Sequence, residues 1–359
     1  MKIGIIGLPL SGKSTVFNAL TGLNAEVKEF SSGGKTKPNL GAVKIPDEKL
    51  QKLADIFKPK KITPATIDFV DMVGISKDAK AEEIDLTPIK DTDALVCVIR
   101  FFKNDKVPHP YGDIDGVRDL RVINTELILL DLNVVETRIE RIQKELQRGK
   151  KENQKELDML KKCQEHLSKE KPLRELKFDS EQNAMLRGFQ LLSKKPMLAL
   201  ANIDEGHIKT GEPDRFAHTA EGLGISHIAF CGKVEAEIAR LDDEELKSSF
   251  MQDLGITETA RGKFIKANSS LLDLITFYTV KGEESKAWLI ERGSTTYVAA
   301  GKIHSDIQRG FIKAELVNFK ELTACDFDMN KVKSEGKLKL EGKDYIVEDG
   351  DIIYFRFSV

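Results

Sequence analysis

The chain contains 359 residues, of which 40% are hydrophobic and 32% are charged. This length exceeds one ordinary hydrophobic core and predicts about two or three domains. No segment approaches the roughly 20 consecutive apolar residues that a membrane span needs, and 56 basic against 58 acidic residues exclude nucleic-acid binding through a global positive field. The four cysteines lie far apart, which argues against a zinc cluster or a disulfide framework and is typical of a cytoplasmic protein.

The N-terminal residues predict a phosphate-binding loop between a strand at Lys2–Ile6 and a helix at Ser14–Leu23. Residues 7 to 14 match the G-x-x-x-x-G-K-[ST] spacing. In such a loop, backbone N–H groups converge on phosphates, the lysine reaches the outer phosphates and the hydroxyl binds Mg²⁺. A chance glycine-rich turn is disfavoured by the flanking elements. The predicted nucleotide-binding residues are Gly7, Leu8, Pro9, Leu10, Ser11, Gly12, Lys13, Ser14 and Thr15, with Lys13 also catalytic and Ser14 also a metal ligand.

A second metal ligand is expected at the end of the strand predicted over Thr66–Val70. Asp71 follows this strand, and Gly74 comes three residues later. After a phosphate loop, this pattern indicates an acid near the Mg²⁺ water shell and a catalytic backbone amide that senses the γ-phosphate. Ile75 stands where Ras-like enzymes carry a glutamine that orients the attacking water. Isoleucine lacks that capacity, so slow hydrolysis is expected.

A long helical insertion is predicted between the strands expected at Ala94–Ile99 and Met197–Ala201. From residue 117 to 194 the composition shifts to Glu, Lys, Gln, Arg and Leu, and apolar residues recur at helical spacing on both sides of Gly149. This pattern predicts two antiparallel helices that form a charged arm. A solvated helical pair without a partner is the alternative.

The residues after the next two strands are candidates for base recognition. GTPases carry Asn-Lys-x-Asp where this chain has Asn202, Ile203, Asp204 and Glu205. A carboxylate one methylene longer does not fit the guanine edge in the same plane, so guanine preference should weaken in favour of adenine. An ordinary strand-to-loop turn is the alternative explanation. The predicted base-binding residues are Asn202 and Glu205, together with Cys231 and Gly232 after the strand expected at Ile225–Phe230.

The alternation of apolar strands and helices predicts a doubly wound α/β fold with a mainly parallel sheet. Beyond about residue 274 the chain changes to short strand-like runs with turns and one helix candidate at Thr296–Ile303, which predicts a small mixed β domain. The expected domains are a nucleotide-binding domain over 1–116 and 195–273, the insertion over 117–194 and a C-terminal domain over 274–359.

These motifs together resemble the Obg-like ATPase family, also called YchF, among the translation-factor-related GTPases. The likeness spans nearly the entire chain and rests on the segments Gly7–Thr15, Asp71–Ile75, Asn202–Glu205, Cys231–Glu237 and Arg309–Glu315. The resemblance implies a P-loop G domain with an inserted coiled-coil arm and a C-terminal TGS domain of β-grasp form. It also implies ATP hydrolysis with Mg²⁺ and association with ribosomes.

Several positions depart from the family pattern. Leu10 stands where the family commonly has an asparagine linked to activation by monovalent cations, and the second switch, residues 77–83, lacks the usual glycines. Thr36 lies one position late in the first switch, yet it is a candidate metal ligand. His109 matches a histidine thought to help place the water and is a catalytic candidate, although a surface-loop histidine is an equal alternative. A divergent subgroup with altered hydrolysis is expected.

The expected function is that of an ATP-driven, or GTP-driven, switch that uses Mg²⁺ and engages the ribosome or ribosomal RNA. No membrane contact and no DNA sequence specificity are expected. Basic residues in the C-terminal domain either face RNA or are scattered surface charge; they are Lys302, His304, Arg309 and Lys313. Two alternatives stay open: a nucleotide-binding adapter with little hydrolysis, and a small-molecule kinase, for which neither an acceptor pocket nor an arginine-rich lid is evident.

Overall fold

The computed structural model describes residues 1–23, 38–71, 87–148, 154–281 and 283–358. They form two compact units. The G unit comprises Lys2–Ala42 and Asp68–Ala267, and the C-terminal unit comprises Met1, Val43–Ile67 and Asn268–Val359. Residues 43–67 and 268–273 belong to the C-terminal unit together with the expected 274–359, and 43–67 contribute a strand to its sheet and a helix that packs on it. The insertion expected over 117–194 falls within the G unit.

The G unit contains the predicted doubly wound sheet. In spatial order the strands are β2 (Asn39–Lys44), β4 (Thr66–Asp71), β1 (Lys2–Ile6), β5 (Ala94–Arg100), β6 (Met197–Asn202) and β7 (Ser226–Phe230). The strands from β4 to β7 in this order run parallel. Every residue of β5 and β6 is buried, as expected for parallel strands that are covered on both faces. Five strands predicted from the sequence are therefore confirmed, each to within one residue at either end.

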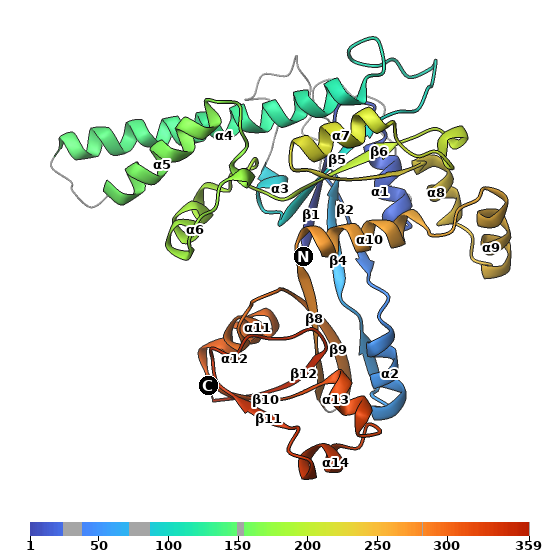
Figure 1. Ribbon diagram of the computed structural model, residues 1–359, viewed down its shortest axis with the longest axis vertical. Helices are drawn as coiled ribbons and strands as arrows, with labels where there is room; N and C mark the ends of the chain where they lie inside the picture. Colours follow the sequence, from blue (N-terminus) through green and yellow to red (C-terminus); the bar gives the residue numbers. More distant parts are fainter. Residues whose placement is uncertain (24–37, 72–86, 149–153, 282, 359) are drawn as a thin grey trace. The chain divides into compact units, whose positions relative to one another are not determined.

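Helices cover both faces of this sheet (Figure 1). α4 (Gly116–Gln147) and α7 (Asp214–Gly222) lie on one face, and α1 (Lys13–Thr21) and α8 (Gly232–Ile238) pack together on the other. Ile123 and Leu127 of α4 and Phe216 of α7 are fully buried in the core of the unit. Outside residues 117–194, the other helical segments among the described residues of the unit are α3 (Thr87–Lys90), η3 (Glu205–His207), α9 (Glu244–Asp253) and most of α10 (Ala260–Leu271).

The predicted arm begins as a single 32-residue helix, α4, that spans about 48 Å at 1.5 Å per residue. Its second half packs on α5 (Gln154–Leu167) in a separate hydrophobic core that includes Val135 and Ile139 of α4 and Leu160 of α5. The second helix, α5, ends at Leu167, the last leucine of the repeat from which it was predicted. The chain from there to residue 194 forms short helical segments: η1 (Leu173–Glu175), α6 (Ser180–Leu186) and η2 (Arg187–Phe189).

One buried carboxylate joins the base of this arm to the strand that follows. Asp131 of α4 accepts hydrogen bonds from the backbone N–H groups of Leu192 (2.8 Å) and Ser193 (2.7 Å) and from the Ser193 hydroxyl (2.6 Å). Burial raises the pKa of Asp131 to about 6, although these three donors lower it. The contact fixes where the insertion ends and β6 begins.

The C-terminal unit contains a mixed sheet with helices on both faces. In spatial order its strands are β11 (Lys339–Glu341), β10 (Phe311–Asn318), β12 (Asp351–Phe357), β8 (Leu274–Lys281), β9 (Glu284–Glu291) and β3 (Lys61–Thr63). β8 and β9 form an antiparallel hairpin, and the last strand, β12, returns parallel to β8. The β-grasp TGS domain that the family resemblance implied stays a prediction, and β3 adds a strand from outside residues 274–359 to this sheet.

Alternate residues of the strands in this sheet face opposite cores, as the period of a β-strand requires. Phe277 packs in the core that contains α11 (Thr296–Ile303), whereas Tyr278 packs in the core covered by α2 (Glu48–Phe57). The Tyr278 hydroxyl donates to Asp47, whose other role is to cap the N-terminus of α2. The other helices of the unit are α12 (Ser305–Arg309), α13 (Phe319–Ala324) and α14 (Met329–Ser334). Within the described residues, no helix has the length and apolar character to cross a membrane.

Candidate nucleotide-binding site

The loop between β1 and α1 ends at a helix N-terminus that no side chain caps. Gly12, the N-cap of α1, adopts a left-handed conformation with φ 88°, and the first turn contains no acidic residue. The first N–H groups of a helix lack partners within the helix and carry a partial positive charge. A nine-residue helix that begins in this way offers its first amides to an anion.

Close packing around the loop requires two of its glycines. A Cβ atom at Gly7 would lie 2.5 Å from the carbonyl oxygen of Val98, and one at Gly12 would lie 2.2 Å from Nδ2 of Asn202. Neither neighbour is the end of a flexible side chain that is free to move away. Leu10 adopts φ 61°, the left-handed region that a leucine rarely occupies. The loop is therefore held in one tight shape.

Lys13 is buried and points back over its own loop. Its Nζ donates to the carbonyl oxygens of Leu8 (2.7 Å) and Gly7 (3.4 Å). Burial lowers the pKa of Lys13 to about 8, and the nearby Asp71 carboxylate raises it only in part. The positive charge of Lys13 is therefore only partly balanced by negative charge of the protein. A bound polyphosphate would supply the rest of that negative charge.

Ser14 and Asp71 meet beneath the loop, as the sequence predicted for the two metal ligands. The Ser14 hydroxyl donates to Oδ2 of Asp71 at 3.0 Å, and Nδ2 of Asn39 donates to the same oxygen at 3.1 Å. Burial raises the pKa of Asp71, while the bonds from Asn39 and Ser14 lower it. The other oxygen, Oδ1, is buried without a hydrogen-bond partner among the described residues.

This donor set fits Mg²⁺, which takes oxygen ligands and commonly combines one or two protein groups with phosphate oxygens and waters. The unpartnered Oδ1 of Asp71 is the observation that supports the fit. The described residues contain no group of three or more His, Cys, Asp or Glu side chains arranged for a metal. Two further predicted residues, Thr36 and Gly74, lie outside the described residues.

Asn202 links the phosphate loop to the loop after β7. Its Nδ2 donates to the carbonyl oxygen of Ser11 at 3.1 Å, and its Oδ1 accepts from the backbone N–H of Gly232 at 3.0 Å. The side chain is buried, so both bonds are shielded from water. The sequence predicted Asn202 and Gly232 as base-binding residues, and the structure shows the polar atoms of this pair bonded to each other and to the phosphate loop.

The other base-site candidates separate into buried and exposed positions. Ile203 is buried in the core of the G unit, and Cys231 is buried as well. Glu205 lies in η3 and is exposed, so its carboxylate has room to meet a base. Asp204 accepts from the backbone N–H of Lys103 at 3.1 Å and so joins the loops after β5 and β6. Position 203, which carries lysine in GTPases, thus contributes to the core.

His109 is buried, contrary to the alternative of a surface-loop histidine. Its Nε2 lies 2.9 Å from Oδ2 of Asp119, and its Nδ1 accepts from the backbone N–H of Tyr111 at 3.2 Å. Burial raises the pKa of Asp119, although a bond from Arg118 opposes this. Both ring nitrogens are occupied in this arrangement. A water-placing role would require the His109–Asp119 pair to open, and it stays a prediction.

Sequence reasoning did not identify two contributors to the site. Asn39 supports Asp71, and the ring of Phe102 lies 3.3 Å from where a Cβ of Gly12 would be. The Pro38-Asn39 pair was a visible signal for the first. Phe102 carried no signal, because only the fold brings the end of β5 to the phosphate loop.

Comparison with known proteins gives consistent results over the whole chain. A family described as 50S ribosome-binding GTPase matches residues 2–162, and the YchF GTPase C-terminal family, described as a protein of unknown function, matches residues 274–358. The chain is 40% identical to the ribosome-binding ATPase YchF of Bacillus subtilis, with 100% of both chains covered. It is 41% identical to the protein of that name from Escherichia coli O157:H7, with 100% of this chain and 99% of the relative covered.

A solved structure resembles the chain over nearly its full length. The YchF GTPase of Schizosaccharomyces pombe superposes with a TM-score of 0.82 at 26% identity, covering 99% of this chain and 97% of that one. Both units of the fold are included in this coverage.

Proposed function

Because the chain belongs to the YchF family, we propose that it binds and hydrolyses ATP with Mg²⁺ as a conformational switch that acts on the ribosome in the cytoplasm. The observation that carries this proposal is the arrangement of Lys13, Ser14 and Asp71 around an uncapped helix N-terminus. The relatives at about 40% identity are named ribosome-binding ATPases, which supports both the nucleotide and the partner.

Each residue of the site has a role that follows from its position. The amides of the loop and of the first turn of α1 would hold the β- and γ-phosphates, and Lys13 would leave the carbonyl of Leu8 to bond the outer phosphates. Ser14 and Asp71 would hold Mg²⁺, which when bound neutralises charge on the phosphate oxygens. Binding would also raise the pKa of Lys13 again, because an adjacent polyanion favours the charged amine.

The preference for ATP over GTP rests on the two residues that differ from the guanine-binding pattern. Ile203 is buried, so no lysine packs across the base, and the exposed carboxylate of Glu205 is one methylene longer than aspartate. We expect Glu205→Asp to shift relative affinity toward GTP by less than about tenfold, since one hydrogen bond contributes about 0.5–1.5 kcal/mol. Lysine at position 203 would bury a charge and is better left out of this test. Equal shifts in both affinities would contradict this assignment of Glu205.

Slow intrinsic turnover follows from the groups that could orient water. The glutamine position is Ile75, and both nitrogens of His109 are bonded within the protein. A ribosome that opens this pair, or supplies a missing group, would accelerate hydrolysis. The competing function is an adapter that binds nucleotide without turnover, and it predicts no hydrolysis with or without ribosomes.

Calorimetric titration of ATP and GTP with Mg²⁺, followed by turnover assays with and without ribosomes, tests the proposal. Lys13→Ala should weaken ATP binding by about 10- to 100-fold, since a hydrogen bond to a charged group contributes about 1.5–3 kcal/mol. Lys52→Ala, which changes an exposed lysine of α2, is the matched control and should bind as the unaltered chain does. Absence of heat with any purine nucleotide would overturn the proposal.

A further inference from the structure

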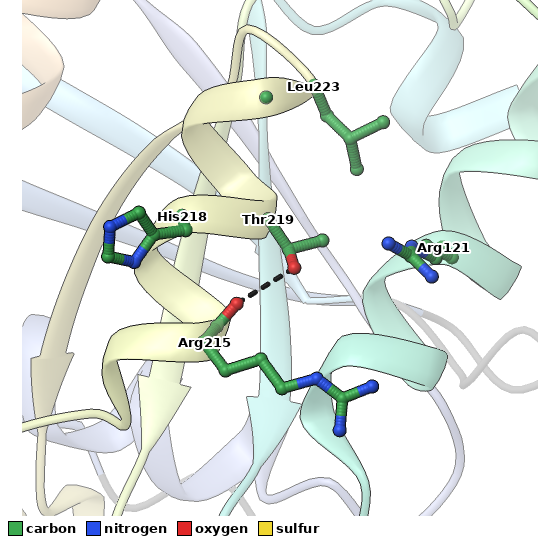
Figure 2. A pocket seen from close by; sticks show the side chains of 6 residues that line it. Arg121, Arg215, His218, Thr219 and Leu223 are labelled. Atoms are coloured by element: carbon green, nitrogen blue, oxygen red, sulfur yellow. Dashed lines mark hydrogen bonds between the residues drawn. The ribbon is translucent and has the colours of Figure 1, made fainter.

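A surface hollow of about 570 Å³ lies between α4 and α7 of the G unit. Figure 2 shows the guanidinium groups of Arg121, from α4, and Arg215, from α7, in the space between the two helices. Both arginines are exposed. The residues that line the hollow are Arg121, Arg215, His218, Thr219, Gly222 and Leu223. None of them belongs to the nucleotide-binding site.

No acidic side chain lines the hollow, and neither arginine forms an ion pair within the part of the chain that the structure describes. The adjacent arginine of α4 behaves differently, since Arg118 pairs with Asp113 and Asp119. Two guanidinium groups from different helices therefore face the same hollow, and no acidic side chain that lines the hollow balances their positive charge. Such a concentration of positive charge favours an anionic ligand.

The basic residues predicted from the sequence of the C-terminal unit provide a contrast. Arg309 lies 2.8 Å from Asp306, and His304 lies 3.4 Å from the same carboxylate. An acid at the centre of that group neutralises part of its charge. The hollow between α4 and α7 carries no such acid and is the stronger candidate for an anion.

The polar atoms nearest the arginines are already occupied. The Thr219 hydroxyl donates to the carbonyl oxygen of Arg215 at 2.8 Å, and Nδ1 of His218 donates to the carbonyl oxygen of Asp214 at 2.7 Å. A ligand would consequently be held by the two guanidinium groups. Their planar forks match phosphate oxygens in a two-point geometry.

We propose that Arg121 and Arg215 bind the phosphodiester backbone of RNA. A small nucleotide requires a pocket that buries most of its surface, whereas the arginines and His218 are exposed here. No Phe, Tyr or Trp side chain lines the hollow, and Nδ1 of His218 is bonded within its own helix, so we expect contacts to the phosphates, which are independent of sequence. The inference rests on the proposed ribosomal function, which brings RNA within reach of this surface.

Helix electrostatics offer a different reason for Arg121. Thr219, Gly222 and Leu223 belong to the C-terminal end of α7, where the helix dipole favours a cation. Arg215 lies in the first turn of α7 and gains nothing from that dipole. If Arg121 serves only to stabilise α7, its mutation should lower thermal stability. In that case, mutation of Arg215 should change neither thermal stability nor RNA binding.

Salt-dependent binding of a short fluorescein-labelled single-stranded RNA of mixed sequence to the full chain tests the proposal. Between about 50 and 200 mM salt, a plot of log affinity against log salt has a negative slope. Each lost phosphate contact makes this slope less steep by about 0.7. We expect that change for Arg121→Gln and for Arg215→Gln, and about twice that for the double variant. Affinity should fall about two- to fivefold for each arginine, as for exposed charge pairs. Arg121→Lys with Arg215→Lys should keep the slope and lose part of the affinity.

Arg141→Gln, an exposed arginine elsewhere on α4, is the matched control and should change neither slope nor affinity. An unchanged slope in the double variant would overturn the inference. A double variant that loses sedimentation with ribosomes while its RNA slope is unchanged would indicate an acidic protein partner and would also overturn it. If Arg121→Gln lowers the melting temperature, Arg215→Gln alone decides the question.

The same variants separate this inference from the proposed function. ATP turnover of the double variant without ribosomes should equal that of the unaltered chain, because neither arginine lies in the nucleotide site. If the unaltered chain fails to sediment with ribosomes yet shows the arginine-dependent slope, the ribosomal function fails while RNA binding at the hollow is supported.

Discussion

Asn202→Ala would remove the side chain that joins the phosphate loop to the loop after β7. The change leaves two buried groups without their partner, the carbonyl of Ser11 and the N–H of Gly232. An unsatisfied buried group costs about 1–3 kcal/mol. Because the deleted side chain leaves room for a water beside both groups, we expect the lower part of the summed range, about 2–3 kcal/mol.

Part of this cost should appear as weaker nucleotide binding, because the loops that Asn202 holds together must be ordered again when ATP binds. If between half and all of this free-energy cost appears in binding, ATP affinity should fall about 5- to 100-fold, because about 1.4 kcal/mol corresponds to a factor of ten. The rest of the free-energy cost should appear as a lower melting temperature of the nucleotide-free protein. Calorimetric titration and a thermal unfolding curve measure the two parts.

Asn202→Asp provides a sharper version of the experiment. The shape is kept, but an oxygen replaces Nδ2 and would face the Ser11 carbonyl oxygen across 3.1 Å, with a buried charge added. Aspartate should therefore be worse than alanine at this position. Asn133→Ala, at an exposed asparagine of α4, is the control and should change stability by less than about 0.5 kcal/mol. Aspartate tolerated as well as asparagine would refute the role of Asn202 as the link between the two loops.

Three further changes test other parts of the G unit. Gly12→Ala should abolish ATP binding, because its Cβ would lie 2.2 Å from Nδ2 of Asn202, whereas Gly22→Ala has open space at a similar φ and should bind ATP normally in calorimetry. Leu10→Asn should raise the melting temperature, since asparagine tolerates the left-handed φ of 61° and relieves up to about 1 kcal/mol of strain. Asp131 has a folded pKa of about 6, above its usual value, so its contribution to stability is present at low pH and is lost as pH rises through 6. Urea unfolding across this window should show that loss in the unaltered chain and not in Asp131→Asn.

Local patterns were sufficient to predict the elements that surround the nucleotide site. β1, β5 and β6 are apolar on both faces and bounded by loops, which identifies buried parallel strands without knowledge of their neighbours. The helix at Thr296–Ile303 was predicted with its observed bounds, and Thr295 caps it. The phosphate loop was predicted because all its residues are consecutive.

Contacts between distant segments could not be predicted in the same way. β3 pairs with β9, more than 200 positions later, and nothing in Lys61–Thr63 states which sheet it will join. Asn202 reaches Ser11 across 191 positions, so its partners depend on the order of strands in the sheet. His109 lies in a loop, as predicted, but its burial could not be predicted from its neighbours in the sequence, because it depends on the path of α4, which brings Asp119 to it.

The placement of residues 43–67 in the C-terminal unit matters for anyone who divides this protein into fragments. A fragment that starts at residue 274 would leave the outer edge of β9 unpaired, because β3 is encoded far upstream. It would also lose the apolar face of α2 that covers Tyr278. Polypeptides cut at the apparent sequence boundary should therefore be prone to aggregate, and a usable fragment would have to carry the 43–67 segment with it.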